Sequence, residues 1–190
     1  MWVSDASGKN ISQLTNYNTS LLQSLKLSEA EEYWFTNDAG IKVQCFLFKP
    51  IDWQQGKEYP LILNIHGGPS GMWGHLWFHE FQMLAAKGYA VYVVNYRGSI
   101  GYGYEFQDAV RFDYGGVNYQ DNVQGVDDIL KRLEWVDSNR LGITGGSHGG
   151  YLTNWIITQT DRFKAAGPNA ASVTGSLHME SKISHPSKCA

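Results

Sequence analysis

The sequence predicts an α/β fold, with a mostly parallel sheet and helices on both faces. Two near-continuous apolar runs, 61–65 and 90–94, are typical of strands that are covered on both sides. Stretches with helical periodicity separate them, and strands that alternate with helices form parallel sheets. A third short strand at 141–144 leads directly into a glycine-rich turn. We therefore expect one α/β sheet to carry most of the chain.

The first 20 residues are predicted to form a separate unit. Residues 2–18 have the pattern of two short strands joined by a turn at 7–9. The polar residues 16–20 then act as a linker to the main domain.

The main domain is predicted over residues 21–166. It begins with a hairpin over residues 31–48, whose turn at 37–40 contains the Asn-Asp-Ala-Gly sequence that favours a reversal of the chain. Residues 167–190 are polar and rich in lysine and serine, so we treat them as a divergent tail.

Three helices are expected between and after the strands, because apolar residues recur there at spacings of three and four. The apolar stripes are Phe78, Phe81, Leu84 and Ala85; Tyr119, Val123, Val126, Leu130 and Leu133; and Tyr151, Leu152, Trp155 and Ile156. Asp121, Asp127 and Asp128 lie on the second of these helices. We interpret them as a solvated face of that helix.

Glycine is concentrated in the strand-to-helix connections. Of the 21 glycines, 16 lie between Gly67 and Gly150. Nine of these lie in three loops, 66–69, 97–103 and 145–150, each of which follows a predicted strand. Because ligands bind at the carboxyl ends of strands in such sheets, all three loops are expected on the functional edge.

Ser147 is the candidate nucleophile. It lies in the sequence Gly145 to Gly150, with glycines on both sides, a strand before it and a helix after it. This is the setting of a strained turn that exposes a serine hydroxyl for covalent acyl transfer. The alternative is an ordinary turn serine.

Backbone amides in the loop 66–69 are candidates for stabilising the oxyanion of acyl transfer. Glycine amides can approach a substrate closely because no Cβ intervenes, so Gly67 or Gly68 fits this task. The amide of His148 is the second expected donor. The ring of His66 is interpreted as holding the loop together rather than acting as a base.

No metal site or cofactor is predicted. His75 and His79 are one helical turn apart beside Glu80, but the ligand order is incomplete, so we interpret them as surface or packing residues. Cys45 and Cys189 are far apart and have no ligand spacing, which gives neither a disulfide framework nor a metal site.

Composition excludes several classes of partner. With 15 basic and 18 acidic residues, the chain has no electrostatic signature of nucleic-acid or anionic-membrane binding. The N-terminus has no signal-peptide pattern, and no run is long and apolar enough for a membrane span. The expected location is the cytoplasm. Nothing in the sequence determines the oligomeric state.

The glycine loops resemble those of the prolyl oligopeptidase family of serine peptidases, and most closely its acylaminoacyl-peptidase and dipeptidyl-aminopeptidase-like branch. The matching segments extend over residues 30–166. They are His66-Gly67-Gly68-Pro69, Asn95-Tyr96-Arg97-Gly98-Ser99, Gly101-Tyr102-Gly103, Asp113-Tyr114-Gly115-Gly116, residues 137–142, residues 145–150 and residues 160–166. The resemblance implies an α/β-hydrolase domain that cleaves peptide or acyl-amino bonds in short peptides.

By this resemblance, Ser147 is the nucleophile, and the amides of Gly68 and His148 take the oxyanion-hole positions. The resemblance also identifies residues 2–18 as similar to the last strands of the β-propeller that precedes the catalytic domain in family members. No cofactor is implied.

The resemblance leaves the acid and the base of the catalytic triad unassigned. In the family these follow the serine as aspartate and then histidine, but no aspartate follows Asp161 here, and His178 and His185 lie in the divergent tail. The last strands of the family sheet are therefore expected to be missing, which would leave an apolar sheet edge exposed. We expect impaired activity in these 190 residues. A carboxylesterase and a catalytically inactive fragment are the alternatives.

Overall fold

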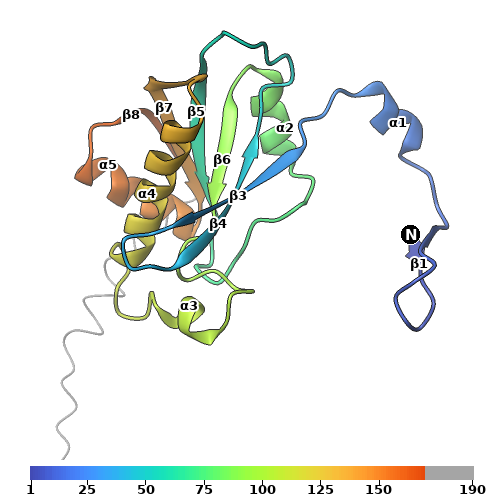
Figure 1. Ribbon diagram of the computed structural model, residues 1–190, viewed down its shortest axis with the longest axis horizontal. Coiled ribbons are helices and arrows are strands. Elements are labelled where there is room, and N and C mark those ends of the chain that lie inside the picture. The colour runs from blue at the N-terminus through green and yellow to red at the C-terminus, as the bar shows by residue number, and fades with distance from the viewer. Residues whose placement is uncertain (170–190) are drawn as a thin grey trace, which may run out of the picture.

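The structure is a computed structural model that describes residues 1–169, and it contains a two-stranded and a six-stranded sheet (Figure 1). The predicted tail lies almost wholly outside the described residues. The elements are β1 (Trp2–Val3), β2 (Ser12–Gln13), α1 (Thr19–Ser24), β3 (Ala30–Thr36), β4 (Lys42–Phe48), β5 (Tyr59–Ile65), α2 (His79–Ala86), β6 (Ala90–Val94), α3 (Tyr104–Asp108), α4 (Val117–Arg132), β7 (Val136–Gly146), α5 (His148–Gln159) and β8 (Phe163–Asn169).

The large sheet has the strand order β3-β4-β6-β5-β7-β8. Strands β6, β5, β7 and β8 are parallel, and the β3–β4 hairpin joins β6 in antiparallel pairing. The predicted α/β class, the hairpin and the mostly parallel sheet are therefore confirmed. Strand β8 runs to Asn169, which is three residues beyond the domain boundary expected at 166.

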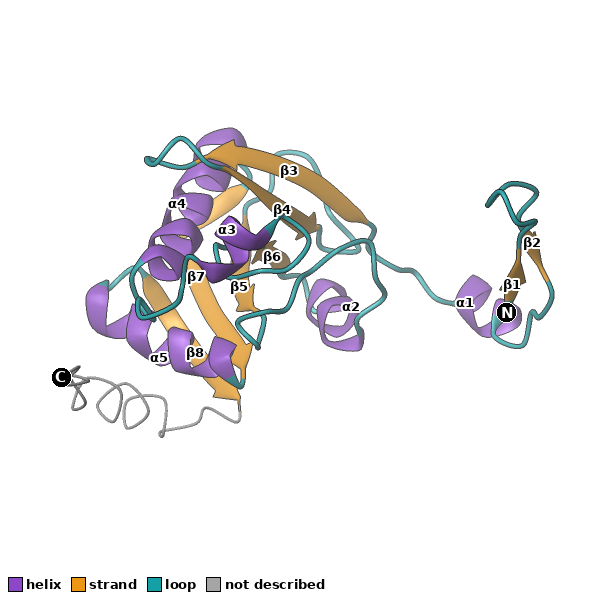
Figure 2. Ribbon diagram, turned by 90° about the horizontal axis from the view of Figure 1, so that it is seen from below, coloured by secondary structure: helices purple, strands orange, loops and turns teal. Residues whose placement is uncertain are grey.

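Helices cover both faces of the sheet, as the continuous apolar strands predict (Figure 2). On one face, α4 and α5 contribute Val126, Ile129, Leu152 and Ile156 to a core that includes the inward residues of β5 and β7. On the other face, Phe81 of α2 packs with Phe46, Phe48, Val91 and Val93. The three expected apolar stripes thus mark real helices that pack against the sheet, but Trp155 of the third stripe is exposed.

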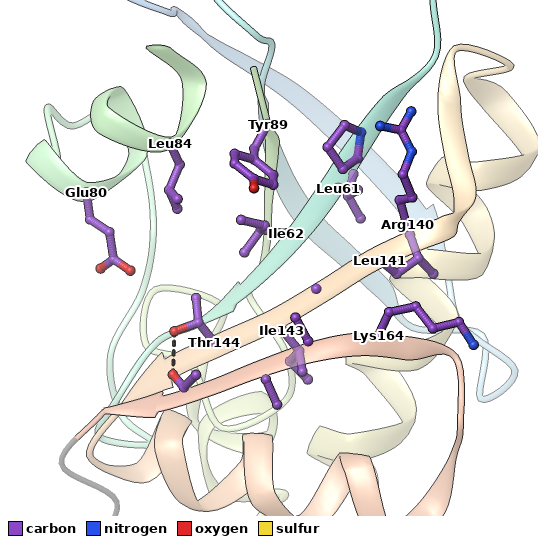
Figure 3. A pocket seen from close by; sticks show the side chains of 15 residues that line it. Leu61, Ile62, Glu80, Leu84, Tyr89, Arg140, Leu141, Ile143, Thr144 and Lys164 are labelled. Atoms are coloured by element: carbon purple, nitrogen blue, oxygen red, sulfur yellow. Dashed lines mark hydrogen bonds between the residues drawn. The ribbon is translucent and has the colours of Figure 1, made fainter. Parts of the chain in front are cut away.

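The face that α2 covers is open farther along the sheet, over β5, β7 and β8 (Figure 3). A hollow of about 600 Å³ lies there, with Ile62, Leu84 and small residues such as Gly142 in its wall. Charged side chains of Glu80, Arg140 and Lys164 also line it. None of the predicted site residues does, so this hollow is separate from the predicted site.

The first 20 residues form the predicted hairpin in shortened form. Trp2 pairs with Gln13 and Val3 pairs with Ser12. In both views the hairpin and α1 lie away from the large sheet, joined to it by an extended segment (Figures 1 and 2). Most side chains of this unit are exposed.

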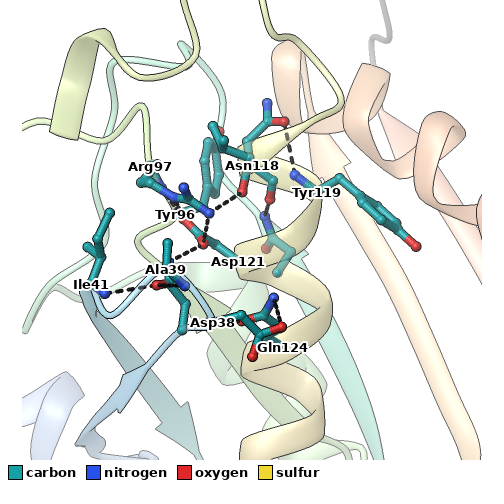
Figure 4. Close-up of polar contacts among 12 residues, drawn as sticks. Asp38, Ala39, Ile41, Tyr96, Arg97, Asn118, Tyr119, Asp121 and Gln124 are labelled. Atoms are coloured by element: carbon teal, nitrogen blue, oxygen red, sulfur yellow. Dashed lines mark hydrogen bonds and ion pairs between the residues drawn. The ribbon is translucent and has the colours of Figure 1, made fainter. Parts of the chain in front are cut away.

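The interpretation of Asp121 as a solvated residue is wrong. Its side chain is 0% exposed, and its carboxylate accepts hydrogen bonds from the Arg97 backbone N–H (2.8 Å), Arg97 Nε (2.9 Å) and Arg97 Nη2 (2.8 Å), as well as from Asn37 Nδ2 (2.8 Å) (Figure 4). The physical reason is that Arg97, which follows β6, is 7% exposed and needs a buried counter-charge. Asp127 and Asp128 are half-buried and pair with Arg162 and Arg132.

No helix among residues 1–169 is both long enough and apolar enough to cross a membrane.

Candidate functional site

The predicted site lies where the strand order of the sheet reverses. Strand β5 is parallel to both of its neighbours, with β6 on one side and β7 on the other. The chain passes from β5 first to β6 and later to β7, on opposite sides, which creates a crevice at the carboxyl ends of the strands. The three glycine loops follow β5, β6 and β7, so the expectation that they share one edge is confirmed.

Ser147 occupies a strained turn between β7 and α5. Its backbone has φ 56° and ψ −117°, a positive φ that a side-chain-bearing residue rarely adopts. The residue is exposed, its N–H donates to the Asn169 carbonyl (3.0 Å), and its carbonyl accepts from the Tyr151 N–H (3.0 Å). Both backbone groups are therefore fixed, while the side chain projects at the start of a helix.

Two glycines allow the turn around Ser147 to pack in direct contact with the backbone of strand β5. A Cβ at Gly149 would lie 2.1 Å from the Ile65 carbonyl oxygen, and a Cβ at Gly145 would lie 2.7 Å from the same atom. Backbone atoms cannot move aside as a flexible side chain does. Residues Gly145 and Gly149 are therefore required for the close packing of α5 on β5.

The loop after β5 lies against Ser147. A Cβ at Gly67 would be 3.4 Å from Ser147 Cβ and 3.0 Å from the Gly146 carbonyl oxygen. Gly68 has φ 124°, and a Cβ there would be 2.4 Å from the Ser70 nitrogen. Glycine at these two positions brings bare backbone to the nucleophile candidate without steric conflict.

Several backbone N–H groups at this point have no acceptor among residues 1–169. They include those of Gly67, Gly68 and His148, the first residue of α5. An N–H in the first turn of a helix has no partner within the helix, and the helix dipole favours negative charge there. A hollow of about 280 Å³ adjoins this region and is lined by His66, Gly67 and Gly146. The arrangement suits an anionic oxygen beside Ser147.

The ring of His66 holds the loop, as expected. Its Nδ1 is 2.9 Å from the Gly67 carbonyl oxygen and its Nε2 is 2.8 Å from Ser99 Oγ. The ring stacks on Tyr96 at a centroid distance of 4.3 Å, and the Tyr96 hydroxyl donates to the His66 carbonyl (2.9 Å). Burial lowers the pKa of His66 to about 4, so this ring is neutral near pH 7.

The ring of His148 is also held by neighbours. Its Nε2 is 3.4 Å from Asn118 Nδ2, and the ring centroid is 5.1 Å from that of Tyr114. Burial lowers its pKa to about 4 as well. His178 and His185 lie outside the described residues. The described part of the chain thus leaves the general base unassigned.

His75 and His79 do not come together with a third ligand. The His75 ring packs edge-on against Phe46 at 5.2 Å, and its Nε2 is 3.8 Å from Glu32. The His79 ring lies 5.8 Å from Trp77. Among the residues that the structure describes, no group of three potential ligands gathers around one point.

Reasoning from the residues missed the side chains that support the loop. Asn95 is fully buried, and it pairs with both backbone groups of Trp73 through Oδ1 (2.7 Å) and Nδ2 (2.8 Å). Ser99 is fully buried and contacts His66. The sequence feature that could have pointed to these two residues is the largely polar segment 95–99 directly after an apolar strand. This segment contributes to the family resemblance, but the sequence alone assigns no role to Asn95 or Ser99.

Comparisons with known proteins agree with this geometry. Residues 75–185, more than half of the chain, match the sequence model of the Prolyl oligopeptidase family. The uncharacterized peptidase YuxL of Bacillus subtilis is 52% identical over 159 residues, covering 84% of this chain and 24% of that protein. Dipeptidyl-peptidase 5 of Schizosaccharomyces pombe is 37% identical over 128 residues, covering 66% of this chain and 19% of that protein. The chain belongs to the prolyl oligopeptidase family.

Solved structures of peptidases have the same fold as this chain. An acylaminoacyl peptidase in complex with Z-Gly-Gly-Phe-chloromethyl ketone superposes with a TM-score of 0.83 at 37% identity, covering 86% of this chain and 26% of that one. A puromycin-hydrolyzing peptidase of Mycobacterium tuberculosis has a TM-score of 0.69 at 31% identity, covering 82% and 23%. The chain spans about a quarter of the length of the relatives that it matches.

Proposed function

We propose that this chain carries the nucleophile and the oxyanion site of a serine peptidase that cleaves peptide or acyl-amino bonds in short peptides. The observation that carries the proposal is the strained backbone of Ser147 beside two amides, those of Gly68 and His148, that have no acceptor among residues 1–169. Family membership and the peptidase names of the relatives support the same reaction.

In the proposed reaction, Ser147 Oγ attacks the carbonyl carbon of the scissile amide. The carbonyl oxygen becomes an oxyanion and accepts hydrogen bonds from the amides of His148 and of Gly68 or Gly67. Each donor of this kind lowers the barrier by about 3 to 4 kcal/mol. Collapse of the intermediate breaks the C–N bond, the amine leaves with a proton, and water then hydrolyses the ester on Ser147.

We further propose that the β1–β2 hairpin belongs to a β-propeller that precedes the hydrolase domain. Its antiparallel strands and its separation from the large sheet support this assignment (Figure 1). Residues 1–20, 21–166 and 167–190 remain our proposed division of the chain.

Hydrolysis of anilides and esters tests the proposed reaction. We expect the full-length enzyme to cleave acyl-amino or aminoacyl p-nitroanilides, and we expect Ser147→Ala to lower kcat by about 10⁶-fold, as loss of a nucleophilic serine does. Turnover of p-nitrophenyl esters without anilide cleavage would support the carboxylesterase alternative. Anilide cleavage that survives Ser147→Ala would exclude Ser147 as the nucleophile.

A further inference from the structure

The hollow beside Gly67 and Gly146 is also lined by a carboxylate, that of Glu80 on α2. Figure 3 shows this side chain extending from α2 toward the end of β5. Within residues 1–169, Glu80 forms no ion pair, and no lysine or arginine lines this hollow. The positive end of the α2 dipole offsets only about half of one charge. The hollow therefore carries a net negative charge.

The side chain of Asn64 adds a second acceptor to the wall. Asn64 belongs to β5, is 4% exposed and lines the same hollow. Its Nδ2 lies 3.4 Å from Glu80 Oε1, which is the favourable orientation of the amide because an NH₂ group can donate to a carboxylate. In this orientation the Asn64 Oδ1 accepts no hydrogen bond from residues 1–169. A ligand that donates hydrogen bonds would satisfy this oxygen.

Two aromatic rings complete the wall. Trp73 and Phe78 line the hollow, and their ring centroids are 5.2 Å apart. A carboxylate, an amide oxygen and aromatic rings together form a setting that attracts an ammonium group and repels an anion. The volume of about 280 Å³ is near the lower end for ligand pockets, about 300 Å³, which suits one or two residues of a peptide.

The hollow lies within reach of a carbonyl group held beside Ser147. Gly67 and Gly146 both line it, and a Cβ at Gly67 would be 3.4 Å from Ser147 Cβ. In an aminoacyl group the amino nitrogen and the carbonyl carbon are two bonds apart, about 2.5 Å, and each further residue adds at most about 3.6 Å. An amino terminus one or two residues from the scissile bond therefore reaches the hollow.

We propose that Glu80 and Asn64 bind the free amino group of the substrate, so that the enzyme takes peptides with an unblocked N-terminus in preference to N-acylated peptides. This inference rests on the function proposed above, which places the scissile bond at Ser147. The bound ammonium neutralises the Glu80 carboxylate, which would otherwise oppose the formation of a nearby oxyanion. An N-acyl group brings no positive charge, so it leaves that repulsion in place.

Hydrolysis of paired anilides by the full-length enzyme measures this preference. L-alanyl and L-alanyl-L-alanyl p-nitroanilides are each compared with their N-acetyl forms. In the pair that is cleaved faster, we expect kcat/KM to be about 10- to 100-fold higher for the free amine, as expected for a hydrogen bond to a charged group. In Glu80→Gln, we expect most of this preference to be lost. Glu134→Gln, at an exposed residue beyond the end of α4, is the matched control and should keep it.

Equal kcat/KM within both pairs, or a preference for the acetylated substrates, would overturn the proposal. A preference for the free amine that is as large in Glu80→Gln as in the wild type would overturn it as well.

Nuclear magnetic resonance of the 190-residue chain tests the amine site without any need for activity. We expect titration with L-alaninamide to shift the side-chain amide signal of Asn64, N-acetyl-L-alaninamide to leave it in place, and Glu80→Gln to abolish the shift. A signal that responds equally to both compounds, or to neither, would rule out the amine site. Absence of any Ser147-dependent hydrolysis in the full-length enzyme would instead count against the proposed function, and the titration would still decide the amine site.

Discussion

Replacing Gly149 with alanine is expected to lower the free energy of unfolding by about 4 kcal/mol or more, or to prevent soluble folding. The added Cβ would lie 2.1 Å from the Ile65 carbonyl oxygen and 2.9 Å from that of His66. Both atoms belong to the backbone at the end of β5 and the start of the loop 66–69. Helix α5 would have to move away from β5, and the turn at Ser147 would move with it.

Gly146→Ala is the matched control for this prediction. The nearest atom to a Cβ at Gly146 is the Asn169 carbonyl oxygen, at 4.0 Å. We expect its free energy of unfolding to stay within about 1 kcal/mol of the wild type. Urea unfolding of both variants measures the difference. Equal stability of the two would show that the close packing of α5 on β5 is not required.

Asp121→Asn is expected to lower the free energy of unfolding by about 3 to 5 kcal/mol, because it leaves Arg97 charged and buried without a counter-ion. Both carboxylate oxygens of Asp121 accept hydrogen bonds, from Arg97 and from Asn37, at 2.8 to 2.9 Å. The substitution replaces one of these oxygens with an NH₂ group, which cannot accept, so the hydrogen bonds to that atom are lost as well. The strand end, the β3–β4 turn and α4 would lose their common anchor (Figure 4).

An exposed ion pair provides the control for Asp121. Asp108 Oδ1 lies 2.9 Å from Arg111 Nε, and the Arg111 side chain is 59% exposed. We expect Asp108→Asn to change the free energy of unfolding by no more than about 1 kcal/mol. Thermal unfolding of the two variants under the same conditions makes the comparison. A loss in Asp121→Asn as small as that in Asp108→Asn would contradict the role of the buried pair.

The sequence predicts the features that depend on local pattern. Strands β5 and β6 contain near-continuous apolar runs, and α4 carries a regular apolar stripe, so local pattern predicts all three elements. Strand β8 was not assigned as a strand, because its exposed residues have no apolar period and it depends on parallel pairing with β7. Helices α1 and α3 are not predicted, because at six and five residues they are too short for an apolar stripe to recur.

The candidate site likewise has a part that local sequence pattern predicts and a part that depends on contacts between distant residues. The sequence around Ser147 indicates a strand, a turn and a helix, and the structure has them in that order. Asp121 could not be placed, because its partner Arg97 is distant in the sequence and helical spacing alone does not distinguish a solvated carboxylate from a buried one. The contact between Ser99 and His66 is equally non-local.

Mapping of a fluorophosphonate adduct by mass spectrometry tests most directly whether Ser147 is the nucleophile. Even without an assigned base, the oxyanion donors alone retain roughly 10³-fold acceleration in a comparable serine protease. We therefore predict an adduct at Ser147 ahead of every other serine, at a rate below that of an intact hydrolase, and none at this position in Ser147→Ala. Labelling spread evenly over exposed serines, with no preference for Ser147, would contradict the account.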